Sequence, residues 1–133
     1  MQVLSISYAL FFVFIFYEVM KFLIKPSYIN SDIIIASACG YFLLIDITVF
    51  LTQFLFYNDP SSFSGLSAAH PAGTYIDLVY FSTIIQTTIG FGDLTPNATH
   101  TKLIVALMGT LGHLYTVVLI GVLISKFTSS QRN

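Results

Sequence analysis

One stretch of six residues decides the fold of this chain: Thr88-Ile89-Gly90-Phe91-Gly92-Asp93. Its two glycines alternate with bulky apolar residues, and glycine adopts positive φ angles without the steric penalty that a Cβ atom brings. A lone Gly-x-Gly is a weak signal, because a strained turn between two helices would also contain one. These six residues in this order, between apolar helices and directly after the short amphipathic segment 75–87, are a strong signal for an extended segment of special backbone geometry.

This stretch closely resembles the selectivity filter of potassium channels, whose usual form is Thr-Val-Gly-Tyr-Gly-Asp. In those channels, backbone carbonyls take the place of the water around the ion. Successive carbonyls can point to one side only through backbone angles that are unfavourable for ordinary residues, which explains the glycines. The resemblance implies that K+ binds in a filter of five residues: Thr88, Ile89, Gly90, Phe91 and Gly92. Its ligands would be the carbonyls of residues 88–91 and the Thr88 hydroxyl, with the Ile89 and Phe91 side chains packed behind the strand.

Composition places the chain in a membrane. Hydrophobic residues make up 56% of its 133 residues, charged residues only 8%, and the mean hydropathy is +0.84. A soluble domain carries about 25% charged residues, so this chain cannot cover a soluble surface. The net charge of −1 offers no basic surface for nucleic acid, and the single cysteine, Cys39, excludes an intrachain disulfide or a cysteine metal cluster. We therefore expect an all-α membrane protein surrounded by lipid.

The first apolar run, Val3 to Ile24, is long enough for a transmembrane helix, which needs about 20 residues. Glu18 and Lys21 interrupt the run but can pair on one helical face. Lys25-Pro26 should end the helix, because proline lacks a backbone donor and disfavours helix at the residue before it. A cleaved signal peptide is the alternative, but no basic residue precedes the run and its end is a poor cleavage site. Residues 1–30 are expected to form an N-terminal transmembrane segment.

Two further runs are expected to cross the membrane. The run 33–57 is the predicted outer helix, with Ser31-Asp32 as its N-cap. The segment 61–73 that follows is rich in Ser, Ala, Gly and Pro, which is typical of an exposed loop. The run 103–127 is the predicted inner helix, followed by a short tail, 129–133. Small residues within it either let helices approach closely or provide bending points. These are Gly109, Gly112 and Gly121.

Between these runs, Thr74 and Asp77 fit a capping box and predict a helix over 75–87. At ~1.5 Å per residue this helix spans about 20 Å, which is too short to cross a membrane. A short helix at membrane depth is tolerated where protein or a watery cavity surrounds it. Its C-terminal end carries the negative pole of the helix dipole, so a helix that ends just before residue 88 favours a cation there.

From residue 33 to residue 127, the chain looks like the pore module of the potassium channel family, and the likeness is most specific over 80–96. It implies a pore module at 31–128. That module consists of an outer helix, a short re-entrant pore helix, an extended filter and an inner helix, so that three transmembrane helices are expected in all. One chain carries one filter and the family builds its pore from four, so a homotetramer is implied. The likeness also equates Gly112 with the family's inner-helix hinge glycine.

Two departures from the family pattern affect the outer side of the filter. Phe91 replaces the usual tyrosine and lacks the hydroxyl that braces the filter. Tyr80 stands where many members have a tryptophan that bonds the filter aspartate. We predict a compensating hydrogen bond from Tyr80 to Asp93, so that these two residues support the filter.

Two ionisable residues fall inside predicted membrane helices, Asp46 in the outer helix and His113 in the inner helix. Charges in lipid are costly and usually face protein or water. Both lie at a similar depth from the outer ends of their helices, so one interpretation is a hydrogen bond between these helices. The other places His113 in a cavity below the filter, where four histidines would charge as pH falls toward about 6.5 and repel potassium.

The sequence thus predicts a potassium-selective channel that conducts passively, with K+ as its permeant ion and no cofactor. No helix carries a periodic series of arginines or lysines, so a voltage sensor is not expected. No regulatory segment follows the inner helix, and no convergent Ser/His/Asp or metal-ligand cluster suggests an enzyme. The alternatives are a less selective monovalent cation channel, a transporter subunit and a non-conducting subunit of a larger channel.

Basic residues predict the orientation in the cell membrane. If three helices span, one side carries four of the five basic residues and the other carries Lys102. The four are Lys21, Lys25, Lys126 and Arg132. The positive-inside rule then places the C-terminus in the cytoplasm and the N-terminus outside.

Overall fold

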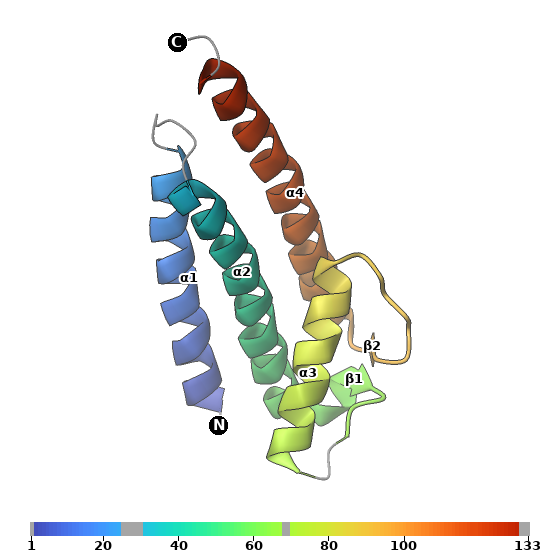
Figure 1. Cartoon of the computed structure of the whole chain (residues 1–133). Coiled ribbons are helices and arrows are strands. Elements are labelled where there is room, and N and C mark those ends of the chain that lie inside the picture. The colour runs from blue at the N-terminus through green and yellow to red at the C-terminus, as the bar shows by residue number, and fades with distance from the viewer. Residues whose placement is uncertain (1, 25–30, 68–69, 131–133) are drawn as a thin grey trace.

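The structure is a computed structural model that describes residues 2–24, 31–67 and 70–130. Its elements, in chain order, are α1 (Gln2–Ile24), α2 (Ser31–Asn58), the 3-10 helix η1 (Pro60–Ser62), β1 (Phe63–Ser64), α3 (Pro71–Gln86), β2 (Thr95–Pro96) and α4 (Thr99–Ser130). Figure 1 shows α1 and α2 side by side as an antiparallel hairpin, with α3 in front of the start of α4. After α3, the chain returns to β2, which pairs antiparallel with β1.

Within the described ranges, three helices are long and apolar enough to cross a membrane. They are Gln2–Ile24, Asp32–Asn58 and Thr99–Ser125, with mean hydropathies of 2.0, 2.2 and 2.1. The predicted all-α fold with three long apolar helices is confirmed. The outer helix begins at Ser31 and ends at Asn58, so the predicted cap residues lie in its first turn, a difference within the usual uncertainty of helix ends.

Helix α1 packs along α2 mainly through aromatic side chains. Phe12 of α1 stacks on Phe50 of α2 with ring centroids 5.5 Å apart. On the exposed side of α1, Lys21 pairs with Glu18 at 3.2 Å, as predicted. The predicted helix stop at Lys25-Pro26 lies outside the described residues. Because α1 touches the remaining chain chiefly through α2, the hairpin forms one side of the molecule (Figure 1).

Helix α3 begins at Pro71, four residues before the predicted Tyr75. The fixed φ of proline suits the first helical position, where the missing N–H has no helical partner to lose. Thr74 therefore lies within the first turn, and its hydroxyl donates to the Ser67 carbonyl over 2.9 Å. Asp77 accepts a hydrogen bond from the Ser67 N–H over 2.7 Å. The predicted capping box is wrong, because its two side chains tie the preceding loop to the helix instead.

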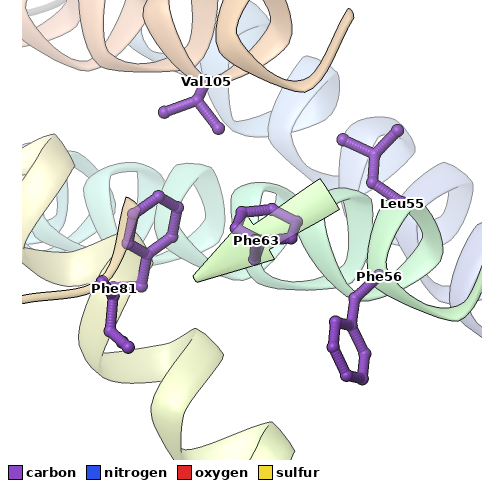
Figure 2. Packing of buried hydrophobic residues seen from close by; sticks show 6 residues of the cluster. Leu55, Phe56, Phe63, Phe81 and Val105 are labelled. Carbon is purple, nitrogen blue, oxygen red and sulfur yellow. The ribbon is translucent and has the colours of Figure 1, made fainter. Parts of the chain in front are cut away.

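The segment 61–73, predicted as an exposed loop, is packed in its first part. Phe63 is buried, and its ring meets Phe81 of α3 edge-on with centroids 5.5 Å apart. Figure 2 shows Phe63 amid the buried cluster that also contains Leu55 of α2 and Val105 of α4. This apolar anchor and the pairing of β1 with β2 join the chain before α3 to the chain before α4.

Helix α4 starts at Thr99, four residues before the predicted Leu103, with the Lys102 N–H donating to the Ala98 carbonyl over 2.9 Å. The helix therefore extends through a polar turn that precedes its apolar run. It continues to Ser130, so the first part of the predicted tail is helical, and residues 131–133 lie outside the described range. The buried face of α4 repeats every three or four residues. It consists of Thr101, Val105, Met108, Gly112 and Tyr115.

Candidate functional site

The filter stretch, residues 88–92, leaves the C-terminal end of α3 and remains bonded to it. Three successive N–H groups donate to two carbonyls of the last helical turn. These bonds are Thr88 to Ile85 at 3.0 Å, Ile89 to Ile84 at 2.9 Å and Gly90 to Ile84 at 3.1 Å. The last carbonyls of a helix lack helical partners, so the filter stretch satisfies two carbonyls near the end of α3.

These hydrogen bonds determine where the carbonyl groups of the filter stretch point. No cis peptide bond occurs among the described residues, and a trans peptide holds its N–H and C=O groups on opposite sides. Because the N–H groups of residues 88–90 face the end of α3, the carbonyls of Thr87, Thr88 and Ile89 face away from it. Three successive carbonyl oxygens therefore point to the same side of the chain.

The sign of φ alternates along the filter stretch. Thr88, Gly90 and Gly92 have φ angles of 61°, 53° and 80°, whereas Ile89 and Phe91 have no positive φ. Alternating left- and right-handed residues turn successive N–H groups to one side, and the planar peptide then turns the carbonyls to the other. A left-handed threonine is uncommon and costs on the order of 1–3 kcal/mol, so the bonds to α3 hold Thr88 in a strained conformation.

The apolar side chains of the filter stretch are exposed in the single chain, so their packing behind the strand stays a prediction. Ile89 is 55% exposed and Phe91 is 69% exposed. The side of the stretch that carries the glycines is open as well. Apart from each glycine's chain neighbours, no heavy atom of the described residues lies within 4 Å of the position that a Cβ would take at Gly90 or Gly92. One chain alone therefore leaves both sides of the filter stretch uncovered.

The predicted hydrogen bond between Tyr80 and Asp93 is confirmed. The Tyr80 hydroxyl donates to Asp93 Oδ2 over 2.9 Å, and this bond raises the pKa of Tyr80 above its usual value of 10.0. Gly65 also approaches Asp93; it lies in the segment 61–73, which is called the outer loop because it is predicted to face outward. It has a φ of +89°, and a Cβ at this position would overlap the Asp93 carbonyl oxygen. Both α3 and the outer loop therefore hold the chain where the filter stretch ends.

A family model described as an ion channel matches residues 41–129, which include most of α2, all of α3, the filter stretch and nearly all of α4. The chain belongs to this ion channel family. Its three apolar helices make it a multi-pass membrane protein. Helix α1 precedes the matched range, and the bounds 31–128 of the expected pore module stay a prediction.

The ion channel is also similar to a curated plant protein, the two-pore potassium channel 4 of Arabidopsis thaliana. The two are 28% identical over 91 residues, which cover 68% of this chain and 30% of the relative. The match therefore spans less than a third of the length of that relative. No solved structure matches the chain.

The structure of this channel chain does not bring Asp46 and His113 together. Asp46 is half-buried and shares a face of α2 with Phe50 and Gln53, four and seven residues along the helix. That face packs on α1, where the hydroxyl of Ser5 donates to Gln53 over 3.3 Å. His113 is exposed on α4, and no hydrogen bond or ion pair joins it to Asp46 in the described chain. The predicted interhelical bond is wrong, because equal depth in the membrane did not mean facing directions.

Gly112 occupies a position of close packing on α4. A Cβ there would overlap the side-chain oxygen of Gln86, the last residue of α3. Gln86 is 2% exposed, and its Nε2 donates to the Thr48 hydroxyl of α2 over 2.7 Å. Gln86 was not among the predicted site residues. The available signal was a long polar side chain two residues before the filter stretch, directly after Ile84 and Ile85 in the last turn of α3. The hinge role of Gly112 stays a prediction.

Proposed function

We propose that this chain is a subunit of a potassium-selective channel and that residues 88–92 form its filter. The three successive carbonyl groups that point away from α3 carry this proposal. A cation that has lost its water needs surrounding oxygens, and backbone carbonyls supply them in potassium channels. The proposed ligands are the four carbonyls of residues 88–91 and the Thr88 hydroxyl. The similarity to a protein named as a potassium channel favours K+ as the permeant ion.

Four copies of the chain are proposed to surround one pore. One filter stretch offers carbonyls from one direction only, whereas a dehydrated ion must be surrounded. The exposed side chains of Ile89 and Phe91 support the same conclusion, since neighbouring copies would cover apolar surface that one chain leaves open. The number four comes from the resemblance to the potassium channel filter, which occurs once in this chain.

Helix α3 is proposed to be a re-entrant pore helix. Its 16 residues span about 24 Å, which is shorter than the hydrocarbon core of about 30 Å. The chain after α3 returns to β2, next to the segment that precedes α3 (Figure 1). The end of α3 therefore meets the filter stretch at membrane depth, where its negative pole favours a cation.

The cell membrane is the proposed location, with the N-terminus outside and the C-terminus in the cytoplasm. The basic residues near the ends of α1 and α4 support this orientation through the positive-inside rule. The pore module at 31–128 then conducts K+ passively, with the segment 1–30 as an additional transmembrane element in contact with lipid. No enzymatic step, voltage sensor or cytoplasmic regulatory domain is part of this proposal.

Acid is proposed to close the conduction path through His113, the second interpretation of that residue. Its side chain is exposed on α4, as a cavity-lining side chain would be in one chain of four. Four charged histidines would repel potassium. Cytoplasmic acid will then reduce the current, and the His113→Gln variant will keep its current. If acid reduces the current of His113→Gln as much as that of the wild type, His113 does not line the cavity.

The proposed function is tested by reconstituting the purified protein in a bilayer with K+ on one side and Na+ on the other. We expect a reversal potential close to the potassium equilibrium value. Gly90→Ala should abolish the selective current, because a methyl group is added at a positive φ of 53° on the open side of the filter. Gly121→Ala is the matched control, since its Cβ would meet no heavy atom within 4 Å and its φ is not positive.

Other outcomes of this experiment identify the competing functions. A reversal potential near zero would indicate a less selective monovalent cation channel, which the absence of a hydroxyl on Phe91 favours. No current at any pH would indicate a non-conducting subunit of a larger channel. Either result would contradict a self-sufficient potassium channel.

A further inference from the structure

Gln86 lies where three helices meet beside the start of the filter stretch. It is the last residue of α3 and is buried from solvent. Its Nε2 donates to the Thr48 hydroxyl of α2 over 2.7 Å, and that hydroxyl donates to the Leu44 carbonyl over 2.9 Å. The hydroxyl proton of Thr48 is therefore donated to the Leu44 carbonyl, so this hydroxyl can only accept a hydrogen bond from Gln86. The amide nitrogen of Gln86 must then face Thr48 of α2, and its amide oxygen faces α4.

The amide oxygen of Gln86 is inserted against α4 at Gly112. Any larger residue at position 112 would place its Cβ on that oxygen. In the part of the chain that the structure describes, Gln86 Oε1 is buried without a hydrogen-bond partner. A buried oxygen in this state is costly, so the bond to Thr48 and the close fit at Gly112 must hold it in place.

The same turn of α3 holds the filter. The carbonyls of Ile84 and Ile85, the two residues before Gln86, accept the hydrogen bonds from residues 88–90. A second contact from this turn reaches α4, because a Cβ at Gly109 would lie 3.0 Å from Ile85 Cγ2. The turn of α3 that meets α4 at Gly109 and Gly112 is therefore the turn whose carbonyls orient the filter stretch.

We propose that Gln86 is a positioning residue that couples the inner helix α4 to the filter through its fit against Gly112. This inference rests on the proposed function and assigns Gly112 a role different from that of a hinge. A hinge glycine acts because its backbone can bend. In this proposal Gly112 acts because its missing side chain leaves room for the amide of Gln86. When α4 moves away from α3 at this point, Gln86 loses its support and the filter carbonyls lose their common direction.

A double-mutant cycle distinguishes the two roles. Gly112→Ala, Gln86→Ala and the double variant are reconstituted beside the wild type, and the K+/Na+ permeability ratio is measured from the reversal potential. We expect Gly112→Ala to lower the ratio by about tenfold, an effect typical of residues in direct contact. Gln86→Ala should lower the ratio as well, and the double variant should lose no more than Gln86→Ala alone, because the methyl group then finds room. Gly121→Ala, where a Cβ meets open space, should leave the ratio unchanged.

Several results would overturn the proposal. They are a double variant whose loss is the sum of the two single losses, a loss in Gly121→Ala equal to that in Gly112→Ala, and no loss in Gly112→Ala. The first two would indicate that backbone freedom in α4 matters instead. If Gly112→Ala does not assemble on size-exclusion chromatography, Thr48→Val is measured, which leaves the Gln86 amide without its acceptor. An unchanged ratio in Thr48→Val would then reject the positioning role, and a lowered ratio would support it.

Failure of the proposed function is recognised separately, because the wild type itself would then show no potassium-selective current. The same four proteins would in that case be compared by their melting temperatures in detergent. Additive shifts in melting temperature would reject the fit between Gln86 and Gly112. A double variant that melts above Gly112→Ala would support the fit.

Discussion

The two halves of α4 differ in what surrounds them. From Thr99 to Tyr115, every turn contributes a buried residue that packs on α2 or α3, including Val105 in the cluster of Figure 2. After Tyr115, none of the described side chains of α4 is buried. The first half is thus held by the chain's own core beside the filter stretch, whereas the second half has only partly buried side chains, such as Leu119, against that core.

An apolar groove marks the transition between the halves. It lies between the C-terminal part of α1 and α4, with a volume of about 240 Å³. Its lining includes Phe16, Met20, Leu23, Leu114, Tyr115 and Val118. Nearer the filter stretch, α4 instead packs on the cluster around Phe63 (Figure 2). The contrast teaches that the chain's own apolar packing on α4 is concentrated beside the filter stretch and ends near Tyr115.

The largest expected loss of stability comes from removing the ring of Phe81, which packs beside the first half of α4. Phe81 is 2% exposed in the cluster around Phe63, so Phe81→Ala should destabilise the protein by about 3–5 kcal/mol. Phe127→Ala is the matched control in the second half of α4, where the ring is 57% exposed. Unfolding of both variants in detergent measures the difference. Similar losses in the two variants would contradict the contrast between the halves.

A smaller effect is expected at the contact between the outer loop and the end of the filter stretch. Gly65→Ala adds a methyl group that overlaps the Asp93 carbonyl oxygen, at a φ of +89°. We expect a loss of about 1–3 kcal/mol, the usual cost of a strained backbone position. Gly121→Ala should be neutral by comparison, since no atom is close to its Cβ position. The melting temperatures of the two variants are compared in detergent. An unchanged melting temperature in Gly65→Ala would show that the loop shifts to accommodate the methyl group at little cost.

The length of each apolar run was sufficient to predict the three long helices. The bond between Tyr80 and Asp93 was predictable only through the resemblance to the potassium channel filter, in which a tryptophan takes the place of Tyr80. The same reasoning anticipated glycines at positive φ but not the left-handed Thr88. That conformation arises from hydrogen bonds to α3, which no residue preference reveals.

Contacts between distant segments were not predictable in this way. The Ser, Gly and Pro content of the outer loop predicts an exposed segment, yet Phe63 within it is buried by residues from three helices. In addition, strand β1 of this loop pairs with β2, which lies more than thirty residues later in the chain. Counting residues along the helices predicts a similar membrane depth for Asp46 and His113. Depth along a helix, however, does not determine which neighbouring helix a side chain faces.

Tyr115 lies at the border between the halves of α4, and its hydroxyl offers a test of moderate size. It donates to the Ser37 carbonyl of α2 over 2.7 Å, with Gly40 making room for the ring. Tyr115→Phe should cost about 1 kcal/mol of stability and raise the fraction of time that the channel is open. Tyr41→Phe is the control, because its ring stacks on Tyr115 but no described group bonds its hydroxyl. Equal open fractions in the two variants would show that Tyr115 only packs.

The smallest expected effect concerns the exposed bond between Tyr80 and Asp93 at the end of the filter stretch. Tyr80→Phe should shorten open-state lifetimes and lower selectivity at neutral pH with little change in melting temperature, because the bond lies at the surface. The bond to Asp93 raises the folded-state pKa of Tyr80 above 10.0. Its contribution is therefore complete below pH 10.0 and is lost as pH rises through the raised value. Wild type and variant should differ at neutral pH and converge in strong alkali. Equal lifetimes and selectivity at neutral pH would mean that this bond does not brace the filter, and that Gly65 and the outer loop alone hold Asp93.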